Sequence, residues 1–119
     1  MLPWIARILC TLVAVEHFYF CVLECFLWNT PFGRRTFGTT PEFAASTAPM
    51  MANQGVYNAF LAAGLVFGLI RGDTEVVLFV LGCVVLAGVV GAATVKIGIL
   101  WLQALPAALA FAAVLIAAR

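Results

Sequence analysis

The sequence predicts an all-α integral membrane protein, a bundle of four transmembrane helices with a short interfacial helix in the first loop. Two observations carry this prediction. First, 66% of the residues are hydrophobic and only 9% are charged, against about 25% charged in an ordinary soluble domain. Second, the apolar residues form four runs, each long enough to cross a hydrocarbon core of about 30 Å as a helix. We expect one integral membrane domain over residues 1–119, with spans at about 3–28, 50–70, 76–97 and 99–118.

The first run, residues 3–28, has aromatic residues at its two ends. Trp4 and Trp28 fit the preference of tryptophan for the membrane interface. Pro3 fits an early helical position, because the N–H that proline lacks would be unsatisfied there anyway. At 1.5 Å per residue the run is roughly 39 Å long, which is enough to span the membrane with some tilt.

The longest polar connection, residues 29–49, follows this run. Residues 30–33, with the sequence TPFG, are typical of a turn or a helix stop. Thr40, Pro41 and Glu42 are typical of a helix start, with an N-cap, a proline at the first helical position and an acid in the first turn. We therefore expect a short interfacial helix over residues 41–48, and Pro49 permits a new helix to start after it.

The three later spans are more uniformly apolar. The second contains a G-x-x-x-G pattern at Gly64 and Gly68, which allows close helix approach and favours a homodimer through that face. The third is rich in glycine and alanine, and the fourth has Pro106 as an expected kink. Basic residues divide three and three between the two sides of the membrane, so the positive-inside rule predicts no orientation.

Polar residues inside the spans are the candidates for function, because ionisable groups at membrane depth are costly and functional by default. By position along the helices, the strongly polar ones fall between the midplane and the side of the 29–49 loop, and the other half contains only Arg7 near its edge, Cys10 and Thr11 besides apolar residues. This distribution predicts a polar pocket open to one side. Glu24 is expected to face the amides of the second span, with Glu16 gaining and losing a proton and His17 as a partner of the acids. The candidate ligand-binding or proton-carrying residues are Glu16, His17, Glu24, Asn53, Gln54, Tyr57, Asn58 and Gln103.

Other site chemistries receive little support. His17 and Glu24 share a helix face with Cys21, but their rise of roughly 10 Å is too large for one metal ion, so we expect no metal site and no cofactor. No cysteine pair has C-x-x-C spacing. The net charge of +1 gives no case for nucleic-acid binding. The expected partners are membrane lipid, an unknown small ligand and a second copy of the chain.

Three functions remain open at this stage. The favoured one is a non-enzymatic, multi-pass protein of the cell membrane that binds or transports a small or amphiphilic ligand. The second is a membrane enzyme that acts on a lipid-soluble substrate, with His17 or Glu24 as acid or base and the catalytic residues otherwise unknown. The third is a non-catalytic assembly protein whose polar residues hold helices together.

Several motifs along nearly the whole chain carry a family resemblance. They are Glu16-His17, Leu23-Glu24-x-Phe26-Leu27-Trp28, Thr30-Pro31-x-Gly33-Arg34, Phe37-Gly38-x-x-Pro41-Glu42-Phe43, Ala52-Asn53-Gln54-Gly55-x-Tyr57-Asn58, Gly91-Ala92-Ala93-Thr94 and Gln103-Ala104-Leu105-Pro106. Together they resemble the domain of unknown function 1304 family. This resemblance implies a small four-span membrane protein and supports the choice of residues, but it supplies no substrate. The length and the acid in the first helix are also similar to the small multidrug resistance exporters, in layout only, so their exchange mechanism is an analogy.

Overall fold

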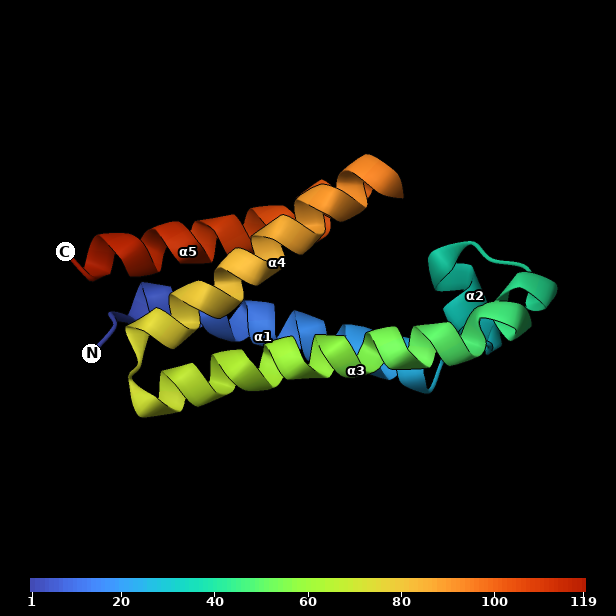
Figure 1. Ribbon diagram of the computed structural model, residues 1–119, viewed down its shortest axis with the longest axis horizontal. Helices are drawn as coiled ribbons and strands as arrows, with labels where there is room; N and C mark the ends of the chain where they lie inside the picture. Colours follow the sequence, from blue (N-terminus) through green and yellow to red (C-terminus); the bar gives the residue numbers. More distant parts are fainter. The chain divides into compact units, whose positions relative to one another are not determined.

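The computed structural model describes all residues from 1 to 119 and confirms the all-α prediction (Figure 1). Its helices are α1 (Trp4–Cys25), α2 (Pro31–Phe37), α3 (Pro41–Arg71), α4 (Thr74–Thr94), the π-helical segment η1 (Leu100–Ala104) and α5 (Leu105–Ala117). Four stretches are long and apolar enough to cross a membrane, namely Trp4–Cys25, Pro41–Arg71, Thr74–Thr94 and Leu100–Ala117. The chain is therefore a multi-pass membrane protein.

The chain divides into two compact units. The polar unit is Val15–Ala62 and contains the second half of α1, α2 and the first two thirds of α3. The apolar unit is Met1–Ala14 with Ala63–Arg119 and contains the start of α1, the end of α3, and α4, η1 and α5. The expectation of a single integral membrane domain stays a prediction.

The first loop contains a short helix, but it lies earlier than expected. α2 begins at the TPFG sequence that we interpreted as a turn or a helix stop. Thr30 is its N-cap, accepting a 3.1 Å hydrogen bond from the Gly33 N–H, and Pro31 occupies its first turn. Gly38 ends α2 in the left-handed conformation with φ 68°, which glycine adopts at little cost. The Thr-Pro pair thus marks a helix start here just as it does at residues 40 and 41.

The separate interfacial helix predicted over residues 41–48 is wrong. Thr40 caps a helix as expected, accepting a 3.1 Å hydrogen bond from the Phe43 N–H, but that helix is α3 itself, which continues through Pro49 for 31 residues. A proline at 49 removes the N–H that would bond the Ala45 carbonyl, and because Ala45 is exposed, that carbonyl can be solvated. At about 46 Å, α3 is longer than the hydrocarbon core of about 30 Å that a span must cross.

Two further boundaries differ from the expected ones for local reasons. α1 ends at Cys25, three residues before Trp28, which lies in the turn that follows. The irregularity expected at Pro106 is the π-helical segment that precedes it, in which the Leu105 N–H bonds the Leu100 carbonyl. This wider turn accommodates a ring that clashes with the carbonyl four residues earlier in a regular α-helix.

Small residues hold the apolar unit together. A Cβ added at Gly88 of α4 would lie 2.7 Å from the backbone nitrogen of Ala104 in η1, so the two segments are in backbone contact. Gly64 and Gly68 of α3 pack mainly against the side chains of Val80 and Val77 of α4. The G-x-x-x-G face therefore contacts α4 within the chain, and the homodimer stays a prediction.

Candidate intramembrane polar site

The candidate site lies in the polar unit, where Glu24 of α1 meets Asn58 of α3. The Asn58 side-chain amide donates a 2.5 Å hydrogen bond to Glu24 Oε1. Asn58 is buried and Glu24 half-buried. The expected pairing of Glu24 with an amide of the second span is thereby confirmed, and it joins two helices that are distant in sequence.

Gly55 allows this pair to meet. It lies one turn before Asn58 on the buried side of α3, and a Cβ added there would lie 2.5 Å from Cys25 Sγ and 3.1 Å from Glu24 Cβ. The Cys25 thiol in turn donates to the Ala52 carbonyl at 3.3 Å. Because α3 carries no side chain at Gly55, its backbone comes close enough to α1 for the short Asn58 side chain to reach the carboxyl group.

A second set of contacts fixes the loop end of the polar unit. Trp28 Nε1 donates to Thr47 Oγ1 at 2.9 Å, and the Trp28 ring lies 4.7 Å from the Phe37 ring of α2. A Cβ added at Gly33 would overlap the carbonyl of Leu27, so α2 lies directly against the backbone of residues 27 and 28. Trp28 is 8% exposed and packs against protein.

Glu16 and His17 form a different environment one to two turns earlier on α1. The His17 side chain is completely buried, with its ring edge-to-face against Phe20 at 5.3 Å. Its Nδ1 lies 3.9 Å from Glu16 Oε1, which is too long for a hydrogen bond. Glu16 Oε1 is buried and has no hydrogen-bond partner. This buried oxygen therefore has capacity to accept from an additional donor.

The other α3 residues of the predicted site take part in neither of these two pairs. Asn53, Gln54 and Tyr57 are exposed on α3, and the Tyr57 ring contacts Phe60 at 5.6 Å. Gln103 is half-buried in η1 and belongs to the apolar unit. The structure thus brings together Glu24 with Asn58 and Glu16 with His17, whereas Asn53, Gln54 and Tyr57 are part of neither contact.

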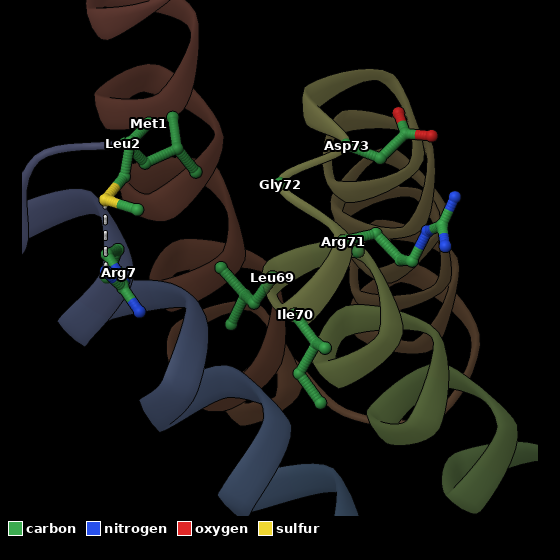
Figure 2. Close-up of a pocket in the computed structure, with 9 residues that line it drawn as sticks. Met1, Leu2, Arg7, Leu69, Ile70, Arg71, Gly72 and Asp73 are labelled. Carbon is green, nitrogen blue, oxygen red and sulfur yellow. Dashed lines mark hydrogen bonds between the residues drawn. The ribbon is translucent and has the colours of Figure 1, made fainter.

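Sequence reasoning missed a cavity at the end of the spans in the apolar unit. It has a volume of about 350 Å³ and is lined by Met1, Leu2, Arg7 and residues 68–73 (Figure 2). A second cavity of about 390 Å³ lies around Lys96 and Trp101, at the turn between α4 and η1. None of the eight predicted site residues lines either one. The span order could have indicated the first cavity. Arg7 lies near the start of the first span and Arg71 at the end of the second, so both are on the same side of the membrane.

Comparison with known proteins identifies a family and adds no reaction. Residues 11–115 match the family described as "Protein of unknown function (DUF1304)". The uncharacterized protein YpaA of Lactococcus lactis subsp. lactis (strain IL1403) is 31% identical over 91 residues, which cover 73% of this chain and 76% of that protein. No solved structure matches the chain.

Proposed function

This chain belongs to the DUF1304 family of proteins of unknown function, and we propose that it binds or transports a small or amphiphilic ligand at the intramembrane carboxyl group of Glu16. The supporting observation is the buried oxygen of Glu16 that lacks a hydrogen-bond partner. A buried, unpaired polar atom is costly in an apolar medium. A bound proton, or a hydrogen-bond donor of a ligand, would remove this cost. Ligand binding can therefore be exchanged for proton binding at the Glu16 carboxyl group.

The two acids of α1, Glu16 and Glu24, have different roles. Glu24 already accepts a hydrogen bond from Asn58, which favours an architectural role for that pair, as in the assembly interpretation. Glu16 has only the long contact with His17. The exchange of a ligand therefore falls to Glu16, with His17 as its neighbour, while Glu24 and Asn58 fix the distance between α1 and α3.

The surroundings of Glu16 indicate the class of ligand. Its neighbours on α1, Val15 and Tyr19, are 59% and 48% exposed in the chain and so available to lipid or to an apolar ligand. A ligand that reaches Glu16 from this side needs an apolar body and a head that donates a hydrogen bond or carries positive charge. The enzyme interpretation is less well supported, because His17 is completely buried and Glu24 is engaged.

A vesicle experiment tests the proposal. The purified chain is reconstituted with a pH-sensitive dye inside the vesicles, and the lipophilic cation tetraphenylphosphonium is added outside. We expect proton release coupled to uptake of the cation, abolished in Glu16→Gln, which keeps the shape of the side chain but cannot exchange a proton. Binding of the same cation in detergent, measured by calorimetry, separates binding from transport.

Glu24→Gln is the matched control. It removes the second carboxyl group of the same helix while keeping an oxygen that accepts from Asn58, so flux and binding should continue. Equal flux in Glu16→Gln and in the unmodified chain would show that Glu16 carries no exchange.

A further inference from the structure

We propose that the cavity between the start of α1 and the turn after α3 binds the anionic headgroup of a membrane phospholipid, with Arg7 contacting its phosphate (Figure 2). This inference concerns the apolar unit alone and does not depend on the role of Glu16. It depends on the environment of Arg7, the walls of the cavity and the place of both along the spans.

Arg7 is a half-buried cation without an anionic partner. Its guanidinium lies 5.3 Å from the centre of the Trp4 ring and donates a weak 3.7 Å hydrogen bond to the Met1 sulfur. Neither group is charged, and no carboxylate lies within ion-pair distance. A guanidinium has five N–H donors in a planar fork that matches phosphate oxygens, so most of its binding capacity is unused.

The other charged residues of the cavity are engaged elsewhere or directed away. The Asp73 carboxylate accepts a 3.2 Å hydrogen bond from the Val76 N–H and thereby caps α4. In Figure 2 the side chains of Arg71 and Asp73 extend away from Arg7. Arg7 is therefore the cation available to a ligand in the cavity, and Arg71 is a second arginine of the same cavity with a different orientation.

The walls and the size of the cavity fit a lipid. Leu2, Leu69 and Ile70 are apolar, and Ile70 is 79% exposed, so acyl chains can continue along the outside of α3. The volume of about 350 Å³ is at the lower end of the range for small-molecule sites, about 300–1,000 Å³, and suits a small headgroup. A ligand with a phosphate for Arg7 and a tail for this wall is an anionic phospholipid.

The position along the spans favours a lipid phosphate over a soluble one. α1 begins at Trp4 and α3 ends at Arg71, so the cavity lies where two membrane-spanning helices reach the same surface. That level is occupied by lipid headgroups, whose negative charge attracts basic residues near the ends of spans. Gly72, with φ 65° and nothing within 4 Å of an added Cβ, leaves the turn itself uncovered.

Native mass spectrometry of the full chain provides the test. The protein is exchanged from detergent into an equal mixture of phosphatidylglycerol and phosphatidylcholine with identical acyl chains. We expect retention of phosphatidylglycerol in preference to phosphatidylcholine. Arg7→Ala and Arg7→Gln should each lower the retained phosphatidylglycerol about fivefold, because the direct contact between the guanidinium and the phosphate is lost. Arg7→Lys should lose part of it, because an ammonium does not form the bidentate contact.

Arg71→Ala is the matched control and should change retention less than twofold. Equal losses in the Arg71 and Arg7 variants would overturn the proposal in favour of general charge attraction, and so would unchanged retention in folded Arg7→Gln. Millimolar glycerol phosphate, added as a soluble competitor, should displace little lipid. Complete displacement would overturn the assignment to a lipid and indicate a soluble phosphate ligand. A rise in the melting temperature with phosphatidylglycerol, absent in the Arg7 variants, provides a second readout.

Discussion

In the polar unit, side-chain hydrogen bonds connect the chain around α1 to α3. In the apolar unit, glycines of α3 and α4 instead make close packing contacts with residues of the adjacent helical segment. Glu24 with Asn58 and Trp28 with Thr47 represent the first kind, and Gly88 with Ala104 represents the second. The difference matters because lipid tails are as apolar as leucine, so burying apolar side chains between helices contributes little free energy to their association in a membrane. Close packing and interhelical hydrogen bonds are the two remaining sources of stability.

The polar unit uses both sources at one place. Gly55 brings the backbone of α3 against α1, and the hydrogen bond of Asn58 forms one turn later. At Glu24 and Asn58 the hydrogen bond between spans forms beside a small residue, whereas at Gly88 the small-residue contact has no side-chain hydrogen bond beside it. Substitutions that remove one source of stability at a time measure the two separately.

The largest effect is expected from Gly88→Ala in the apolar unit. The added Cβ would lie 2.7 Å from the Ala104 nitrogen and 2.9 Å from its Cα, and since these are backbone atoms, α4 and η1 must separate. We expect the free energy of unfolding to fall by about 3 kcal/mol, the upper part of the range for overpacking. Thermal unfolding in detergent, followed by circular dichroism, measures it.

Gly82→Ala is the control for this prediction, since an added Cβ on the same helix would meet only the Phe111 ring at 4.0 Å. It should be neutral or slightly stabilising, because alanine is a better helix former than glycine. If Gly88→Ala were as well tolerated as Gly82→Ala, the contact with Ala104 would not be what holds these segments.

An intermediate effect is expected from Asn58→Ala in the polar unit. The substitution removes the donor to Glu24 and leaves a half-buried carboxyl group without its partner. We expect a loss of about 1–2 kcal/mol, between the average for a hydrogen bond between spans and the cost of an unsatisfied buried group. Reversible unfolding in mixed micelles is a suitable measurement.

Asn53→Ala provides the matched control, because Asn53 is the same residue type on the same helix but is exposed. It should change stability by less than about 0.5 kcal/mol, as surface substitutions usually do. A loss for Asn58→Ala larger than that for Gly88→Ala would reverse the comparison and make hydrogen bonding the stronger source.

The smallest effect is expected from Trp28→Phe. Phenylalanine keeps an aromatic ring against Phe37 but cannot donate to Thr47. We expect a loss of about 0.5–1 kcal/mol, the net value of one neutral hydrogen bond. A double-mutant cycle with Thr47→Val isolates this bond, and a coupling energy near zero would show that the contact with α2 alone positions Trp28.

Much of the fold was predictable because it follows from local hydropathy. The four spans and the Thr40 cap were found from the sequence, and so was the partnership of Glu24 with an amide of the second span. The short helix was placed ten residues too late, because the sequence TPFG serves as well for a helix start as for a turn. Pro49 was taken as a boundary, although membrane helices tolerate proline where the freed carbonyl is satisfied.

The site was only partly predictable, because several polar residues on α3 compete for the same role. Asn53, Gln54 and Tyr57 are as polar as Asn58 in the sequence, yet they are exposed. The distinguishing signal was the row of small residues on one face, since Gly55 and Ala62 are buried with Asn58. That face was identifiable from helical periodicity, and it identifies Asn58 as the amide closest to α1.

The number of apolar spans and the polar residues within them follow from the sequence alone, because bilayer thickness and side-chain transfer energies act on each segment separately. Which polar groups meet depends on how the helices pack. That outcome depends on the rotation of α3 about its axis, which is set by the contact at Gly55, and on the place of α2 against residues 27 and 28. The same packing satisfied Glu24 and left one oxygen of Glu16 without a partner, a difference between two acids of one helix that no local pattern contains.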